Sequence, residues 1–221
     1  MTPISFITPI KNRTDIVIEH RGKKIRLKLF QNTIQSLIDI ITPEDCWEYV
    51  IVDFKSDDVN MTEFIESLQK PDNLIFKIHT VDQPFFDRGG GINIGVELAS
   101  HPVIFVMDAD MMIKSRKMFD DIEDVVVKQN KVMFALCWYY LNPNHTRGFL
   151  PNGGTGNVIL KKDMFVNMTN NSSWGKEDNI NEAYFVSRGL SCRMYYHENK
   201  EFIHQWHPSD IRHIYYPSKP T

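Results

Sequence analysis

Two aspartates one residue apart, Asp108 and Asp110, are the residues of this chain best suited to hold a divalent cation. They directly follow the apolar run Val103 to Met107, which is typical of a buried strand. Carboxylate oxygens are the hard ligands that such cations prefer. The alternative is an ordinary strand end, with one acid capping a helix and the other solvated.

Two histidines three residues apart, His204 and His207, stand in the sequence His-Gln-Trp-His-Pro near the end of the chain. An imidazole nitrogen can complete a mixed oxygen and nitrogen ligand set of the kind that Mn²⁺ accepts. The alternative is a pair of hydrogen-bonded or surface histidines beside a packed tryptophan.

A second pair of acids, Glu177 and Asp178, follows Trp174-Gly175-Lys176. The glycine permits a tight turn, and the acids then fall in the first turn of a helix, where the helix dipole favours negative charge. One carboxylate could instead take a proton from a hydroxyl nucleophile, a role worth roughly 10²–10⁴ in rate. Both interpretations stay open on these residues alone.

Arg88 precedes Gly89-Gly90-Gly91 and a predicted helix. Glycines at a helix start permit close approach of a phosphate, and a guanidinium matches phosphate oxygens. The pattern is neither a Walker A loop nor Gly-x-Gly-x-x-Gly, which disfavours a P-loop NTPase and a standard Rossmann dehydrogenase.

Alternating strands and helices must position these residues. The apolar patterns predict strands over 4–7, 49–54, 74–78 and 103–107, and helices over 27–41, 61–68 and about 89–100. This alternation predicts a mostly parallel sheet with helices on both faces. Ligands bind beyond the carboxyl ends of such strands, where the polar clusters 11–15, 53–58 and 108–110 fall.

The second half of the chain has a less regular pattern. It predicts strands over 131–140, 158–160, 191–196 and 202–206, and a helix that starts near residue 177. Polar loops over 142–157 and 167–174 lie between them and are candidate lids, because a sixteen-residue loop in a compact domain is more often functional than not.

Composition limits the class of protein. The 221 residues, 42% of them hydrophobic, fit one globular domain. The net charge of −3 excludes a broadly basic nucleic-acid binder. We find no apolar run of membrane-spanning length, and three widely spaced cysteines fit neither a disulfide framework nor a zinc site. We expect a cytoplasmic domain, unless the chain is an excised part of a larger enzyme.

Together these motifs resemble the GT-A glycosyltransferases, and within them the family-2-like branch of β-1,4-galactosyltransferases and chondroitin synthases. The similarity runs from about residue 4 to 208. Lys176 stands where a second glycine is usual, and Asn179 where a third acid is common. The segments that carry the resemblance, in family order, are 8–13, 52–57, 86–88 with 93–95, 108–110, 174–178 and 204–207.

The resemblance implies one GT-A catalytic domain over residues 1–221, a Rossmann-like α/β/α sandwich with a mostly parallel central sheet. Residues 1–112 would form the nucleotide-binding half, and residues 113–221 a smaller, irregular acceptor and catalytic half.

The resemblance also implies roles for individual residues. Asp53 would lie at the uracil and ribose end of the donor, Arg88 at its diphosphate and Asp108 near the ribose. The implied metal ligands are Asp108, Asp110 and His207, with His204 a further candidate. Glu177 would bind sugar hydroxyls, and Asp178 would be the general base. The full set of implied nucleotide-sugar contacts is Thr8, Pro9, Lys11, Asn12, Arg13, Asp53, Ser56, Arg88, Asn93, Asp108, Ala109, Gly153, Gly154 and Trp174.

The implied activity is transfer of a hexose or N-acetylhexosamine from a UDP-sugar to a hydroxyl of a glycan or glycoconjugate, with Mn²⁺ or Mg²⁺ as cofactor and inversion at the anomeric carbon. No nucleic-acid partner and no integral membrane segment are expected, and such a catalytic domain would suit a soluble cytoplasmic enzyme of bacterial or viral type. The alternatives are a retaining GT-A transferase and a catalytically silent nucleotide-sugar or glycan-binding module. A small metallohydrolase is disfavoured, because the chain lacks a His-Glu-x-x-His pattern.

Overall fold

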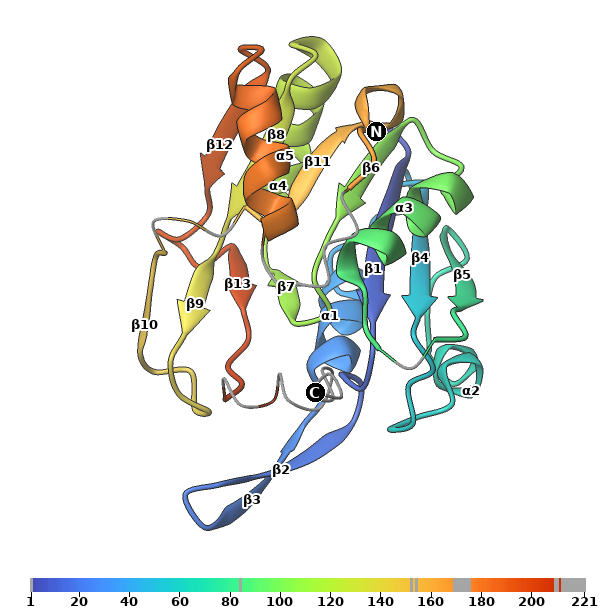
Figure 1. Cartoon of the computed structure of the whole chain (residues 1–221), viewed down its shortest axis with the longest axis vertical. Helices are drawn as coiled ribbons and strands as arrows, with labels where there is room; N and C mark the ends of the chain where they lie inside the picture. Colours follow the sequence, from blue (N-terminus) through green and yellow to red (C-terminus); the bar gives the residue numbers. More distant parts are fainter. Residues whose placement is uncertain are drawn as a thin grey trace, which may run out of the picture.

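A twisted, mostly parallel sheet forms the centre of the computed structural model, which describes residues 2–83, 85–151, 153, 155–168, 176–208 and 211 (Figure 1). Within these residues seven strands pair in the order β12-β8-β11-β6-β1-β4-β5. Only β11 runs antiparallel to its described neighbours, β6 and β8, so the predicted α/β fold is confirmed. The strands are β1 (Ile4–Ile10), β4 (Trp47–Asp53), β5 (Leu74–Thr80), β6 (Val103–Val106), β8 (Val132–Leu136), β11 (Val158–Lys161) and β12 (Ser191–Tyr195).

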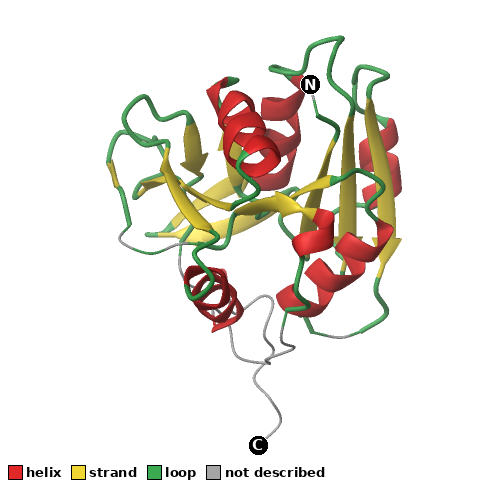
Figure 2. Cartoon of the chain, turned by 90° about the horizontal axis from the view of Figure 1, so that it is seen from above, coloured by secondary structure: helices red, strands yellow, loops and turns green. Residues whose placement is uncertain are grey.

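Helices cover both faces of this sheet (Figures 1 and 2). On one face lie α1 (Leu29–Ile38), α2 (Met61–Glu66) and α4 (Lys117–Ile122), which continues as a π-helical segment (Glu123–Lys128). On the other lie α3 (Arg88–Leu98) and α5 (Lys176–Val186). Successive strand residues point to opposite faces, so Phe6 packs with the first group and Ile7 with the second. In the described part of the chain, no helix has the length and apolar character needed to cross a bilayer.

A second, smaller sheet adjoins the first, with the order β10-β9-β13-β7. Its strands are β7 (Met111–Ile113), β9 (Trp138–Tyr140), β10 (Gly148–Phe149) and β13 (Phe202–His204). The prediction of one strand over 131–140 is wrong, because this stretch divides at the buried Cys137. Its first part, β8, pairs with β11 and β12, whereas β9 pairs with β13 and β10. One straight strand could not pair with partners in both sheets.

A hairpin of β2 (Ile16–His20) and β3 (Lys23–Leu27) extends from the body of the molecule (Figure 1), and the sequence analysis did not predict it. Its two-residue turn, Arg21-Gly22, has φ of 52° and 71°. Positive φ at both positions is the type I′ geometry, whose twist matches that of paired strands. The helix expected from residue 27 therefore begins only at Leu29.

Glu48, a charged residue in the middle of β4, is buried but fully engaged. Its carboxylate accepts hydrogen bonds from Ser5 Oγ at 2.7 Å and from the Ser100 amide at 2.8 Å, and pairs with Lys77 Nζ at 2.6 Å. Burial by itself would raise the pKa of Glu48, but Lys77, Ser100 and Ser5 outweigh burial and lower it to about 2. The acid thus links β1, β4, β5 and the segment after α3.

We expect Glu48→Gln to be destabilising in a pH-dependent way. Because the folded-state pKa lies below its ordinary value of 4.5, ionised Glu48 stabilises the fold above that pH, and this contribution is lost as pH falls toward 2. Wild type should exceed the variant by about 3 kcal/mol in unfolding free energy at pH 7. Urea denaturation at pH 7, 5, 4 and 3 measures the gap, and a gap that stayed constant down to pH 3 would contradict this account.

Candidate functional site

The loops that follow β1 and β4 are tied together at the carboxyl edge of the sheet. Ser56 Oγ donates to Asp53 Oδ1 at 2.6 Å and accepts from the backbone N–H of Asn12 at 3.0 Å. Asn12 Oδ1 in turn accepts from the Asp57 amide at 2.8 Å. Asn12 adopts a left-handed conformation with φ of 52°, which asparagine tolerates better than most residues. One network therefore unites three predicted nucleotide-site residues, Asn12, Asp53 and Ser56.

The other predicted residues of the first loop divide into buried and rim positions. Thr8 is buried in the core, where Oγ1 donates to the Met107 carbonyl at 2.6 Å and contacts Tyr49 Oη at 2.8 Å. Pro9 is also buried and packs at α3, since a Cβ on Gly91 would lie 2.8 Å from Pro9 Cβ. Lys11 Nζ donates to the Phe54 carbonyl at 2.6 Å. Thr8 and Pro9 thus support the loop, while Lys11 joins it to the end of β4.

Arg88, at the start of α3, connects three distant segments of the site. Its Nε donates to Asp108 Oδ1 at 2.8 Å, Nη1 to Asp178 Oδ1 at 2.6 Å and Nη2 to the Gly156 carbonyl at 2.7 Å. A Cβ on Gly156 would lie 3.2 Å from Asp178 Oδ2 and 3.3 Å from Asp108 Oδ2, tighter than an ordinary contact. Glycine at 156 therefore leaves room for both carboxylates.

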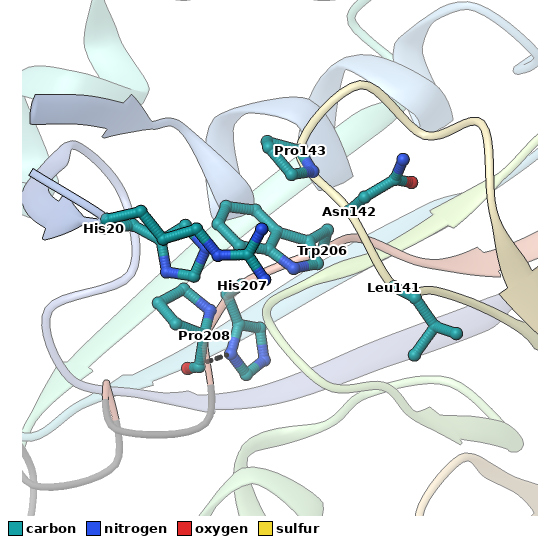
Figure 3. A pocket seen from close by; sticks show the side chains of 8 residues that line it. His20, Leu141, Asn142, Pro143, Trp206, His207 and Pro208 are labelled. Carbon is teal, nitrogen blue, oxygen red and sulfur yellow. Dashed lines mark hydrogen bonds between the residues drawn. The ribbon is translucent and has the colours of Figure 1, made fainter. Parts of the chain in front are cut away.

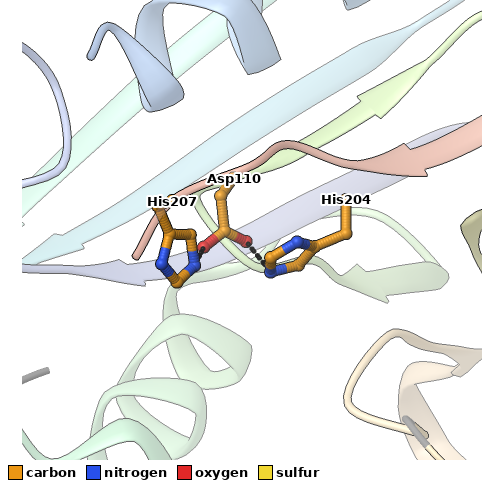
Figure 4. A group of neighbouring side chains, drawn as sticks. All are labelled: Asp110, His204 and His207. Atoms are coloured by element: carbon orange, nitrogen blue, oxygen red, sulfur yellow. Dashed lines mark ion pairs between the residues drawn. The ribbon is translucent and has the colours of Figure 1, made fainter. Parts of the chain in front are cut away.

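Asp110 lies at the centre of a second cluster, which Figure 4 shows. Its Oδ2 is 3.2 Å from His207 Nε2 and 3.6 Å from Arg13 Nη1, and its Oδ1 is 3.6 Å from His204 Nε2. One ligand atom each from Asp110, His204 and His207 lies within 4.8 Å of the others. Asp108 is not in this group. The structure thus brings together Asp110, His207 and the further candidate His204, whereas Asp108 pairs with Arg88.

The donor atoms of this cluster fit a divalent cation. His207 Nδ1 lies 3.1 Å from the Pro208 carbonyl, which can only accept, so in neutral His207 the lone pair of Nε2 faces Asp110. Among the described residues, the buried Asp110 Oδ1 and His204 Nδ1 have no hydrogen-bond partner. A cation between the lone pair of His207 Nε2 and the Asp110 carboxylate would replace their electrostatic repulsion with attraction to both.

The electrostatics of the cluster agree with that fit. Burial by itself would raise the pKa of Asp110, but His204, His207 and Arg13 outweigh it and hold the pKa below its ordinary value. Burial lowers the pKa of His204, which favours the neutral imidazole that a metal requires. His204 and His207 lower the pKa of Asp110 only while they carry positive charge, so a bound cation would supply that charge when the imidazoles are neutral ligands.

Two residues that the sequence analysis missed hold the histidines in place. The ring of Tyr139 stacks on His204 with centroids 4.2 Å apart and planes 4° from parallel. Gln205 is buried. Its side-chain Nε2 donates to the Leu29 carbonyl at 2.9 Å, and its backbone N–H donates to the Asp110 carbonyl at 2.9 Å. The position of Gln205 between the two histidines was the available indication of this role.

The remaining predicted residues have mixed placements. Asn93 exchanges two hydrogen bonds with the backbone of Met168 and so anchors that segment on α3. Ala109 is buried, and its carbonyl accepts from Thr33 Oγ1 at 2.9 Å. A Cβ on Gly153 would meet no atom within 4 Å. Gly154, Trp174 and the side chain of Glu177 lie outside what the structure describes.

Comparison with known proteins identifies the family. The model of one family, Glycosyl transferase family 2, matches residues 5–171. The chain belongs to glycosyl transferase family 2. This confirms the predicted glycosyltransferase assignment, and the more specific branch stays a prediction. A search of curated proteins finds no match.

Solved structures of TarS from S. aureus share the fold. The chain superposes on TarS 1-349 with a TM-score of 0.65 and 14% identity, covering 91% of this chain and 60% of that one. For TarS 1-349 in complex with UDP-GlcNAc the values are 0.68, 13%, 93% and 59%, and for the complex with UDP they are 0.64, 14%, 96% and 62%. The chain therefore spans about 60% of these TarS chains, and the likeness supports the GT-A fold.

We expect Asp110→Asn to abolish stabilisation by Mn²⁺. The substitution removes the anionic ligand at the centre of the cluster, so Mn²⁺ should no longer raise the melting temperature. In the wild type, Mn²⁺ at 100 times its Kd should raise the free energy of unfolding by about 2.7 kcal/mol. Thermal shift with and without MnCl₂ measures this, with the exposed acid variant Asp120→Asn as control. An unaltered Mn²⁺ response in Asp110→Asn would rule out this ligand set.

Proposed function

We propose that this chain is a metal-dependent glycosyltransferase that moves a hexose or N-acetylhexosamine from a UDP-sugar to a hydroxyl of a glycan or glycoconjugate. The observation that carries the proposal is the arrangement around Arg88, which joins Asp178 to Asp108, two residues before the Asp110 cluster. Membership of glycosyl transferase family 2 supports it, as does the likeness to a TarS structure that holds UDP-GlcNAc.

The donor would bind across the carboxyl edge of the sheet. The tied loops place the Asp53 carboxylate and the Asn12 backbone beside each other, where they would receive the uracil and ribose. The motifs assign the diphosphate to Arg88, but Arg88 contacts Asp108 and Asp178, so we propose that Arg13, near Asp110, also faces the diphosphate. Held by Asp110, His204 and His207, Mn²⁺ or Mg²⁺ would supply Lewis acidity toward the departing diphosphate.

Asp178 would serve as general base. The oxygen of the acceptor hydroxyl bonds to the anomeric carbon while the bond from that carbon to the phosphate oxygen breaks, and the hydroxyl proton passes to the Asp178 carboxylate. Arg88 orients this carboxylate through a 2.6 Å hydrogen bond, and orientation is a main part of what an enzyme supplies in such a transfer. Attack opposite to the leaving group inverts the anomeric configuration.

We further propose the narrower assignments that the motifs suggested. The enzyme would belong to the β-1,4-galactosyltransferase and chondroitin synthase branch. Residues 1–112 would bind the nucleotide, and residues 113–221 would form the acceptor and catalytic half, because Asp178, His204 and His207 all come from the second half. A cytoplasmic location stays a prediction.

A panel of nucleotides tests the donor assignment. We expect UDP and at least one UDP-sugar to raise the melting temperature with Mn²⁺ present, by an amount equivalent to about 2.7 kcal/mol at 100 times Kd. ADP-glucose and GDP-mannose should shift it far less, since the site would select uracil. If no uridine nucleotide shifts melting with Mn²⁺ present, the donor assignment is wrong.

Asp178→Asn tests the base. The amide oxygen can still accept from Arg88, so the fold and UDP binding should survive, but the amide cannot take the proton. We expect transfer to fall by roughly 10²–10⁴. Release of UDP measures the rate, and NMR of the product gives the anomeric configuration. Near-normal transfer by the variant would remove Asp178 from this role, and a product of retained configuration would overturn the inverting mechanism.

A further inference from the structure

A hollow of about 490 Å³ lies beside the cluster of Asp110, His204 and His207 and is shown in Figure 3. Its volume falls within the range of about 300–1,000 Å³ that small-molecule sites occupy. His207 lines it and also contacts Asp110, so the hollow and the cluster share a wall. The other lining residues are His20 at the end of β2, Arg21 of the hairpin turn, Leu141, Asn142 and Pro143 after β9, and Trp206 and Pro208.

The hairpin is held firmly against this region. One face of it, Ile16, Ile18 and Leu27, is buried in a cluster with Trp206. The rings of His20 and Trp206 meet edge to face with centroids 5.2 Å apart. These contacts place the end of β2 beside Trp206, and His20 and Arg21 both line the hollow.

The hairpin tip is rich in positive charge, although the whole chain is slightly acidic. Arg26 is engaged by Asp15. Arg21, Lys23 and Lys24 are exposed and form no ion pair with another described residue. Glu19 lies opposite Lys24 in the hairpin, but the tip keeps a net positive charge, which attracts anions to a concave site beside it.

The residue at the turn is itself unusual. Asparagine and glycine are the residues that a type I′ turn favours at its first position, because both accept positive φ. The chain instead has Arg21 there, at φ of 52°. Five other described non-glycine residues share this conformation, so it is the position of Arg21 in the lining of the hollow that points to a role for its side chain.

We propose that this hollow binds a unit of the acceptor glycan that carries a phosphate or carboxylate group. Arg21 would bind the anionic group, to which a guanidinium can donate two hydrogen bonds, and Leu141, Pro143 and Trp206 would pack against the sugar. The proposal rests on the proposed function. It places the charged unit beside His207, whereas Asp178 pairs with Arg88 and does not line the hollow.

Arg21→Asn tests this proposal without disturbing the fold, since Asn-Gly is a favoured type I′ sequence. The probes are glucose 6-phosphate, glucuronate and uncharged glucose, titrated in the absence of Mn²⁺ and UDP. The indole N–H signal of Trp206, assigned by Trp206→Phe, reports binding by NMR. The matched control is Lys24→Gln, which removes an exposed charge from the same hairpin outside the lining of the hollow.

We expect one or both anionic sugars to move the Trp206 signal, with at least about tenfold weaker binding of glucose and a similar loss in Arg21→Asn. Lys24→Gln should change binding by less than about twofold, because exposed charges are screened by salt. Comparison of glucose 6-phosphate with glucuronate identifies the preferred anion.

Several results would overturn the proposal: no response to either anionic sugar, an equal response to glucose, or equal losses in both variants. Equal losses together with binding to phosphatidylglycerol vesicles would assign the charge to a membrane surface. Mn²⁺-dependent UDP binding, measured separately on wild type and Arg21→Asn, keeps the two proposals apart. Absence of UDP binding in wild type would refute the proposed function, whereas UDP binding without a sugar response would refute only the acceptor subsite.

Discussion

The negative charge of Asp110 is the constraint around which the site is organised. Its side chain is about one-tenth exposed, and a buried carboxylate is costly unless cationic or hydrogen-bonding groups surround it. The groups that can supply positive charge come from distant parts of the chain: Arg13 follows β1, and His204 and His207, which are cationic only when protonated, lie at the end of β13 and beyond it. An ionised Asp110 therefore requires a fold that brings these segments together.

The small second sheet is what brings them together. β7 starts one residue after Asp110 and pairs antiparallel with β13, so that Met111 lies opposite His204. The Gln205 amide then donates to the Asp110 carbonyl, and its side chain is bonded to α1. These backbone contacts fix the distance between acid and imidazoles before any ligand binds, which is the preorganisation that a metal or diphosphate site needs.

The sequence predicted the central sheet and its helices better than the side-chain contacts of the site. Buried parallel strands such as β1, β4 and β6 leave continuous apolar runs, so the sheet and its polar edge could be located. The hairpin could not, because its alternation is short and interrupted by charges. Nor could the separate partners of Asp108 and Asp110, although the family resemblance already placed Asp108 nearer the ribose and made Asp110 the likelier metal ligand. The Arg88–Asp178 contact depends on close approach at Gly156, for which no local pattern exists.

Asp108 and Asp110 face different basic side chains of the site. Asp108 and Asp178 share one guanidinium, and both carboxylates reach toward Gly156, so Arg88 offsets a repulsion that would otherwise push the acids apart. Asp110, two residues on, faces the imidazoles. In the proposed reaction, a cation at Asp110 would compensate the leaving diphosphate without competing for the guanidinium that holds Asp178. This separation suits the proposed transfer with inversion, in which the leaving group and the base lie on opposite sides of the reacting carbon.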